Sequence, residues 1–168
     1  FIDFSHELAV QVAHNGREYA VYECCETVQK NHICVAVVTP ARVPDSIKKL
    51  AQKRALQAME VLGTRGIVAF EFFYTPNGNV LLNESAPRPH NSGHYSIEGC
   101  VTSQFENHIR AVLGLDLGST ELTHPASVMI NLLGTQNRTA RVEFSEALLS
   151  EPNGHLHMYG KIQSKIGR

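Results

Sequence analysis

The sequence predicts an α+β protein with a largely antiparallel sheet, and three observations support this. Two pairs of β-like runs flank the Asn-Gly dipeptides at residues 15–16 and 77–78, and Asn-Gly between such runs is a strong hairpin signal. Two segments, residues 44–63 and 102–114, have apolar side chains at helical spacing. Hairpins come first along the chain and mixed helices and strands follow, which is typical of an α+β fold.

The strands are predicted where β-branched and aromatic residues run between turn signals. They cover residues 6–13, 18–28, 32–40, 66–74, 79–84, 127–133 and 155–162. Residues 115–125 are predicted to form a connecting loop. Residues 145–150 (SEALLS) are predicted to form a short helix.

The two long helices have recognisable ends. Asp45 is the expected N-cap of the first helix, and Gly63 ends it. In the second helix, Ser103 and Glu106 have the spacing of a capping box, and Gly114 ends it. The apolar stripes, expected to face the core, comprise Ile47, Leu50, Ala51, Ala58, Met59 and Leu62 in the first helix, and Phe105, Ile109 and Val112 in the second.

Composition limits the classes of protein to consider. The 168 residues fit one domain, or one domain with a small appendage, and 43% hydrophobic with 18% charged residues fits a soluble globular protein. The net charge of −1 predicts neither nucleic acid nor membrane as a partner. No apolar run reaches the roughly 18 residues of a membrane span, and the first residues lack a signal-peptide pattern. The cysteines, without a CxxC pair, indicate reduced thiols in a cytoplasmic protein: Cys24, Cys25, Cys34 and Cys100.

Two glutamates are predicted to face each other across the second hairpin. With a two-residue turn, Glu71 lies opposite Glu84, where Cβ atoms are about 4.5–5.5 Å apart and like charges are destabilising. Either one glutamate takes a raised pKa and shares a proton, or a hard cation such as Mg²⁺ or Mn²⁺, which commonly carries phosphates, binds between them. Two alternatives remain open. Both glutamates could point into solvent, or a longer turn with a bulge could offset the pair by one residue.

The segment APRPHNSGH (86–94) is suited to holding a small anion. Arg88 offers a planar fork of donors, while His90 and Asn91 add neutral donors on a loop stiffened by prolines. A zinc site is the alternative. The prolines disfavour a helix that would align His90 with His94, which weakens that alternative. Near the end of the chain, a phosphate site or a solvated basic tail could be formed by Lys161, Lys165 and Arg168.

Several of these segments together resemble one known family. EFF (71–73), LLNE (81–84) and APRPHNSGHYSIEGCVTSQFENHIRAVLGL (86–115) resemble the N5-carboxyaminoimidazole ribonucleotide synthetases. These are ATP-grasp enzymes of purine biosynthesis, which in fungi are fused to the mutase that follows them. Supporting matches are HELAV (6–10), TPAR (39–42), SVMINLLG (127–134) and HLHMYGK (155–161).

The resemblance implies both a fold and a reaction. Residues 1–125 would be the carboxyl-terminal part of an ATP-grasp domain, and residues 126–168 a small, incomplete β-rich subdomain. ATP, bicarbonate and 5-aminoimidazole ribonucleotide would give ADP, phosphate and the N5-carboxylated ribonucleotide through carboxyphosphate. ATP and Mg²⁺ (or Mn²⁺) are the implied cofactors, and a homodimer and a fused or partner mutase domain are the implied protein partners. The 168-residue fragment alone is not expected to be fully active.

On the nucleotide side, the resemblance implies roles for five residues. Glu71 and Glu84 match the family's Mg²⁺ carboxylates. Asn83 lies beside them in the nucleotide site, Glu7 matches a glutamate at the ATP ribose, and Gln29 matches a position near the nucleotide.

On the bicarbonate side, the resemblance implies that Arg88, His90 and Asn91 hold bicarbonate and carboxyphosphate, with His90 assisting proton movement. Lys161 matches a lysine near the ribonucleotide phosphate. Two other functions are weighed against this one. The first is another ATP-grasp ligase, such as a formate-dependent glycinamide ribonucleotide transformylase, and the second is a non-catalytic structural fragment.

Overall fold

The structure, a computed structural model, describes residues 1–134, 138–139, 151–160 and 163–164. Contacts divide the chain into two compact units, Phe1–Ile130 and Asn131–Arg168. Among the described residues, none of the helices has the length and apolar character required to cross a membrane.

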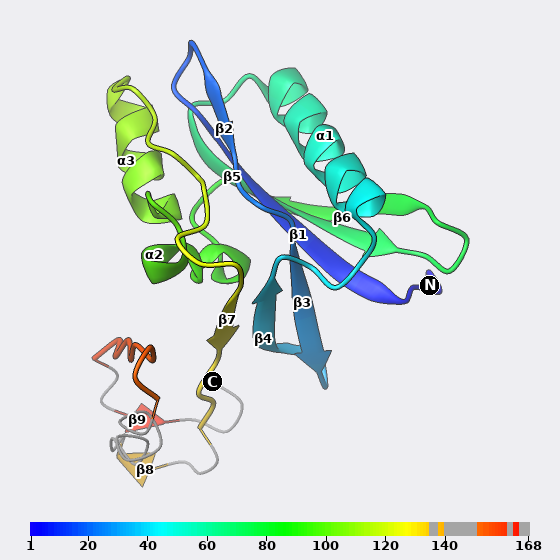
Figure 1. The fold of residues 1–168 in the computed structure, drawn as a ribbon, viewed down its shortest axis with the longest axis vertical. Helices are drawn as coiled ribbons and strands as arrows, with labels where there is room; N and C mark the ends of the chain where they lie inside the picture. Colours follow the sequence, from blue (N-terminus) through cyan, green and yellow to red (C-terminus); the bar gives the residue numbers. More distant parts are fainter. Residues whose placement is uncertain (135–137, 140–150, 161–162, 165–168) are drawn as a thin grey trace. The chain divides into compact units, whose positions relative to one another are not determined.

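The first unit is built on an antiparallel sheet with the strand order β6-β5-β1-β3-β4-β7, and β2 also pairs with β1 (Figure 1). The strands are β1 (His6–His14), β2 (Tyr19–Val21), β3 (Cys25–Lys30), β4 (Ile33–Thr39), β5 (Gly66–Tyr74), β6 (Val80–Ala86) and β7 (Ser127–Ile130). The helices are α1 (Asp45–Leu62), α2 (Ser96–Gly99) and α3 (Gln104–Leu113), with the 3-10 turn η1 at Asn91–Gly93. The predicted α+β fold is therefore confirmed.

The first hairpin is confirmed, but its second run contains two strands. Val12 pairs with Val21 and forms the hairpin of β1 and β2. The run 18–28, predicted as one strand, is interrupted before β3, which also pairs with β1. At the interruption, the Cys24 carbonyl accepts a hydrogen bond from the Ala41 amide (2.8 Å), outside the sheet's ladder.

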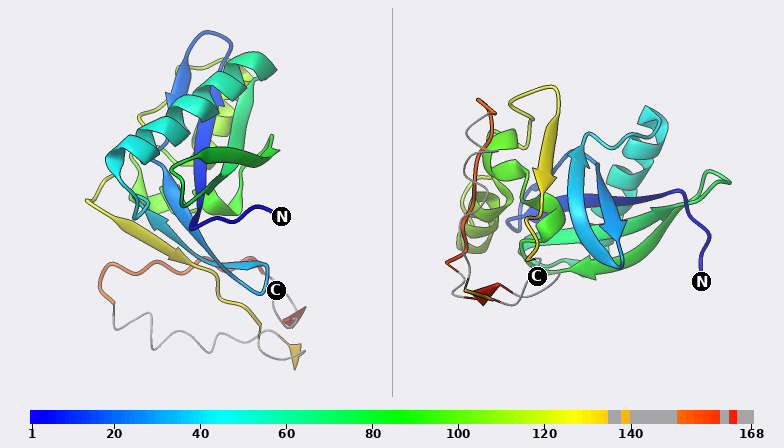
Figure 2. Two further views of the ribbon diagram at one scale, coloured as in Figure 1. Left: turned by 90° about the vertical axis from the view of Figure 1, so that its right-hand side faces the viewer. Right: turned by 90° about the horizontal axis from the view of Figure 1, so that it is seen from below.

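Alternation along the strands gives the sheet two faces, each with its own core. The helix α1 covers one face (Figures 1 and 2), where the buried side chains include Leu8, Val10, Val12, Ala51, Ala55, Met59, Val68, Phe70 and Phe72. Burying one such phenylalanine contributes roughly 1.5–3 kcal/mol. The opposite face has a second core of Ala9, Ala13, Tyr22, Cys25, Val37, Ile67, Tyr95 and Cys100. By the same alternation, the polar residues Gln11 and Glu71 belong to this second face.

The ends of α1 agree with the sequence in part. Gly63 ends the helix in the left-handed conformation (φ 59°), as predicted. Asp45 was wrongly predicted as the N-cap, because Pro44 occupies that position without a side-chain hydrogen bond. Asp45 instead lies in the first turn and pairs with Lys48 at 2.8 Å. Leu62, predicted to be in the core, is 54% exposed.

The helix α3 has the predicted ends but the opposite buried face. The Ser103 side chain accepts a hydrogen bond from the Glu106 amide, and the Glu106 carboxylate pairs with Arg110. The predicted apolar stripe is wrong, because its members are 40–57% exposed: Phe105, Ile109 and Val112. The helix instead buries Gln104, Asn107 and Ala111. The side-chain amides of Gln104 and Asn107 both form hydrogen bonds inside the protein. These bonds compensate for the loss of water when the amides are buried.

The later part of the chain agrees with the sequence only in places. The strand β7 is shorter than the predicted 127–133, and residues 155–160, predicted as strand, lie outside helices and strands. In the second unit, β8 (Arg138–Thr139) pairs antiparallel with β9 (Gln163–Ser164). The predicted helix over 145–150, and Lys161, Lys165 and Arg168, lie outside the described residues.

Candidate active site

The hairpin of β5 and β6 places Glu71 opposite Glu84, as predicted, but through a different register. The turn is longer than the two residues predicted. Tyr74 therefore pairs with Val80, whereas a two-residue turn would pair it with Leu81, so the register next to the turn is shifted by one residue. A β-bulge at Asn83 then shifts the register back before Glu84. The two shifts cancel, and the bulge is therefore what aligns the two carboxylates.

The paired carboxylates have a strongly perturbed environment. The Glu71 side chain is 18% exposed, whereas Glu84 is exposed. Burial raises the pKa of Glu71 from 4.5 to about 7, and the charges of Glu84 and Glu7 and a hydrogen bond with Glu84 act in the same direction. The raised pKa agrees with the predicted alternative in which one glutamate shares a proton. The same crowding of negative charge would favour a bound cation.

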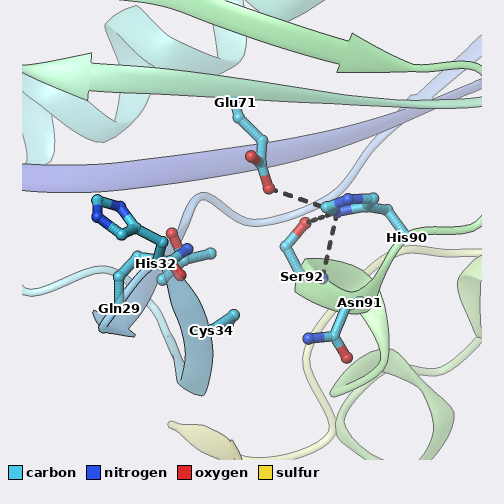
Figure 3. A pocket seen from close by; sticks show the side chains of 8 residues that line it. Gln29, His32, Cys34, Glu71, His90, Asn91 and Ser92 are labelled. Atoms are coloured by element: carbon cyan, nitrogen blue, oxygen red, sulfur yellow. Dashed lines mark hydrogen bonds and ion pairs between the residues drawn. The ribbon is translucent and has the colours of Figure 1, made fainter. Parts of the chain in front are cut away.

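His90 adjoins the Glu71 member of this carboxylate pair (Figure 3). Its Nδ1 lies 3.4 Å from Oε1 of Glu71 and 2.9 Å from Oγ of Ser92. Burial, and next the charge of Arg88, lower the pKa of His90 below its usual 6.5. The ring is therefore mainly neutral at pH 7, and its contact with Glu71 is not a pairing of two full charges.

Gln104 holds the backbone of His90 from both sides. Its Oε1 accepts a hydrogen bond from the His90 amide (3.0 Å), and its Nε2 donates to the His90 carbonyl (2.7 Å). Gln104 is fully buried at the start of α3, and Gly93 leaves room for it, since a Cβ at Gly93 would lie 2.7 Å from its Cδ. The loop before α2 is therefore fixed to the first turn of α3.

A pocket of about 240 Å³ opens between this loop and the sheet (Figure 3). Its lining comes from β3, β4, the turn between them, β5 and the loop at η1, and consists of Thr27, Gln29, His32, Cys34, Glu71, His90, Asn91 and Ser92. The groups that line it are mostly polar and include donors and acceptors. Such a lining suits a small polar or charged ligand.

The structure brings most of the predicted site residues together. Those that line the pocket are Gln29, Glu71, His90 and Asn91. Glu7 and Glu84 lie close enough to act on the Glu71 carboxyl. Arg88 is exposed and donates to the neighbouring Pro89 carbonyl (3.1 Å), while Asn83 is the exposed bulge residue.

Three buried polar residues at the site were not predicted: Gln11, Ser92 and Gln104. Gln11 is a polar residue within the apolar run ELAVQVA, and this signal could have identified it, as it did Glu71. Ser92 lies inside the segment that was predicted to hold a small anion. Gln104 precedes Phe105, where the apolar pattern pointed to the other face of the helix, so the sequence offered no signal for it.

The pKa of Glu71 predicts how the stability of the metal-free chain depends on pH. Because the folded state binds the Glu71 proton more tightly than the unfolded chain, its contribution to stability is complete below pH 4.5 and is lost as the pH rises through about 7. Glu71→Gln, which stays neutral, should therefore increase the free energy of unfolding, relative to wild type, more at pH 8 than at pH 5. Urea unfolding at the two pH values measures this difference.

Glu60→Gln is the matched control, since Glu60 is exposed on α1. It should change the free energy of unfolding equally at both pH values. An equal effect of Glu71→Gln at pH 5 and pH 8 would contradict the buried, proton-binding environment of Glu71.

Comparison with known protein families identifies the class of protein. Residues 1–105 match the family model described as the ATP-grasp domain. Residues 127–168 match the model described as the phosphoribosylaminoimidazole carboxylase C-terminal domain. The chain therefore belongs to the ATP-grasp family.

Known relatives and solved structures are similar over the whole chain. Phosphoribosylaminoimidazole carboxylase of Schizosaccharomyces pombe is 45% identical over 177 residues, which cover 100% of this chain and 32% of the relative. N5-carboxyaminoimidazole ribonucleotide synthetase from Thermotoga maritima has a TM-score of 0.90 at 45% identity, with coverage of 100% of this chain and 46% of that one. The Aspergillus clavatus synthase in complex with ADP and 5-aminoimidazole ribonucleotide has a TM-score of 0.94 at 38% identity, with the same coverage.

These matches confirm the resemblance predicted from the sequence. They also show that this chain spans 32% of the length of the curated relative and 46% of each solved chain.

Proposed function

We propose that this chain is the carboxyl-terminal, metal-bearing part of a ligase that carboxylates 5-aminoimidazole ribonucleotide. The reaction would consume ATP and bicarbonate and give ADP, phosphate and N5-carboxyaminoimidazole ribonucleotide in purine biosynthesis. The observation that carries the proposal is the alignment of Glu71 and Glu84 beside the fixed His90 loop. The similarity to the Aspergillus clavatus synthase, described in complex with ADP and 5-aminoimidazole ribonucleotide, supports it.

The donor set of the hairpin fits a hard divalent cation. Glu71 and Glu84 offer only oxygen ligands. The pKa of Glu71 is raised first by burial and then by the charges of Glu84 and Glu7, and a cation would offset that negative charge. The described residues contain no group of three or more His, Cys, Asp and Glu side chains arranged around a metal, so phosphate oxygens are expected to complete the coordination. When bound, Mg²⁺ or Mn²⁺ would neutralise charge on the phosphates as the γ-phosphoryl group is transferred.

The chain's own residues would then divide the remaining work. Glu7, Gln29 and Asn83 would contact the nucleotide from β1, β3 and the bulge of β6. Arg88 and Asn91 would hold bicarbonate and carboxyphosphate, and His90 would add a hydrogen bond and assist proton movement. For Lys161 we retain the proposed role near the ribonucleotide phosphate.

The boundaries and partners of the chain belong to the same proposal. Residues 1–125 would be the ATP-grasp part and residues 126–168 a β-rich subdomain, in keeping with the two family matches. A homodimer and a fused or partner mutase domain would be its protein partners. The four cysteines, none of which forms a disulfide in the described part of the chain, fit a reducing, cytoplasmic compartment.

The choice of the one-carbon substrate provides the test. In the complete protein in which this chain occurs, ADP release should require 5-aminoimidazole ribonucleotide and bicarbonate, and formate should not replace bicarbonate. ADP release with formate and not with bicarbonate would instead favour a formate-dependent ligase. A non-catalytic fragment would bind no Mg²⁺-nucleotide in a calorimetric titration.

A further inference from the structure

A chain of hydrogen bonds runs from the middle of the sheet to the His90 ring. Nε2 of Gln11, on β1, donates to Oγ of Ser92 (3.0 Å), and Oγ of Ser92 lies 2.9 Å from Nδ1 of His90. Gln11 is 0% exposed and Ser92 is 1% exposed. Gln11 would therefore act on a bound ligand only through this chain, and Ser92, although it lines the pocket, is almost fully buried against His90.

The direction of these hydrogen bonds follows from the donors available. Because Ser92 Oγ accepts a hydrogen bond from the Gln11 amide, its own hydroxyl proton is free to donate, and Nδ1 of His90 is the acceptor beside it. Oε1 of Gln11 has no hydrogen-bond partner among the described residues. Turning the amide over would instead leave an N–H group buried without a partner, which is rarer in proteins than an unpaired carbonyl.

A second donor indicates that Nδ1 of His90 is a hydrogen-bond acceptor, whichever way the Gln11 amide is oriented. The backbone amide of Ser92, which can only donate, points to Nδ1 of His90 at 3.5 Å. Both the amide and the hydroxyl of Ser92 thus treat Nδ1 as an acceptor. The Glu71 carboxyl also faces Nδ1, but its Oε1 lies at 3.4 Å, further away than the Ser92 hydroxyl at 2.9 Å. In a neutral imidazole, the ring proton then lies on Nε2. Within the described part of the chain, Nε2 forms no hydrogen bond, so it is available to a ligand in the pocket that His90 lines.

We propose that Gln11 and Ser92 are positioning residues that hold His90 as its Nε2–H tautomer, so that it presents a hydrogen-bond donor, and not a base, to the anion in the pocket. This rests on the proposed function, in which the anion is bicarbonate and then carboxyphosphate. A donor at Nε2 stabilises negative charge on the anion's oxygen atoms, whereas an unprotonated Nε2 would repel them. His90 therefore binds and polarises the anion, and the proton movement that it assists is donation from Nε2, so another group must accept the proton of the substrate amine.

The protonated nitrogen of His90 can be observed directly, without any substrate. We would label the complete protein with ¹⁵N-histidine, assign His90 by its loss in His90→Asn, and record the ring nitrogens at a pH where the ring is neutral. The protonated and unprotonated nitrogens have well-separated shifts. The proposal predicts that Nε2 carries the proton, and a spectrum with the proton on Nδ1 would overturn it even if the enzyme uses bicarbonate as proposed.

Two variants then test what holds the tautomer. Ser92→Ala removes the hydroxyl, and Gln11→Met removes the amide at similar volume. Each should shift the His90 spectrum toward a mixture of tautomers and lower kcat about tenfold, the effect of one hydrogen bond, while KM for ATP changes less than about twofold. Ser46→Ala, an exposed serine on α1, should change neither the spectrum nor kcat.

The outcomes are separable. A wild-type spectrum in both folded variants would overturn the positioning role of Gln11 and Ser92, because the tautomer would then be held by the Ser92 backbone amide alone. If one variant fails to fold, the spectrum of the other variant tests the positioning role. The wild-type spectrum tests the tautomer itself and requires no variant. A shifted spectrum in an enzyme that does not respond to bicarbonate would support the positioning role and contradict only the proposed function.

Discussion

Glu84→Gln should lower bicarbonate-dependent ATP turnover by about 100- to 1,000-fold in the complete protein, the loss expected when one preorganised charge contact to a transferring group is removed. Glutamine keeps the size of the side chain but removes one of the two negative charges aligned by the bulge. Glu84 is exposed, so the substitution should change the free energy of unfolding by no more than about 0.5 kcal/mol. The measurement is the steady-state rate of ADP release at saturating Mg²⁺, with urea unfolding as the check on folding.

Glu60→Gln provides the matched control, because it makes the same chemical change at an exposed position on α1, which covers the other face of the sheet. Its turnover should equal that of the wild type. If Glu84→Gln retained turnover within about threefold of wild type, the assignment of the hairpin as the metal site would fail.

Gly93→Ala should be the most damaging single-methyl substitution in the loop. The added Cβ would lie 2.7 Å from Cδ of Gln104, which cannot move aside because both ends of its amide hold the His90 backbone. Overpacking of this kind costs about 1–3 kcal/mol, measurable by urea unfolding. The displaced loop should also lower turnover by about 100-fold, since small misplacements of a reacting group are costly.

A double-mutant cycle separates this contact from a general effect of the methyl group. Gln104→Ala removes the obstacle, so adding Gly93→Ala to it should cost at least about 1 kcal/mol less than adding it to the wild type. Strictly additive free energies of unfolding would contradict the proposed contact between Gly93 and Gln104.

Local patterns in the sequence were sufficient for much of the fold. Asn-Gly turns, and the glycines Gly63 and Gly114 at the ends of helices, depend on backbone conformation within a few residues. The structure confirms both hairpins and the carboxyl-terminal ends of both helices. The pairing of Glu71 with Glu84 was also predicted. A longer turn with a bulge was left open only as an alternative that would offset the pair, whereas the structure has both and keeps the pair aligned. A bulge depends on contacts with other strands and with the rest of the sheet. Counting residues outward from the turn in two strands gives no information about those contacts.

The residues that fix the loop could not be found from the same patterns. Apolar periodicity identifies buried faces only where burial is apolar, and α3 buries Gln104 and Asn107 while it exposes Ile109. These amides are buried because partners distant in the sequence satisfy them, such as His90 for Gln104 and Tyr22 for Asn107. Those partners become neighbours only once the sheet and the loop have formed.

Anomalous diffraction from Mn²⁺ offers the most direct test of the paired-carboxylate site. Crystals of the complete protein, grown with Mn²⁺ and a non-hydrolysable ATP analogue, should show a manganese peak at a coordination distance of about 2 Å from both the Glu71 and the Glu84 carboxylates, with the analogue's phosphates completing the shell. A peak coordinated by neither glutamate, or by only one of them, would contradict the shared site.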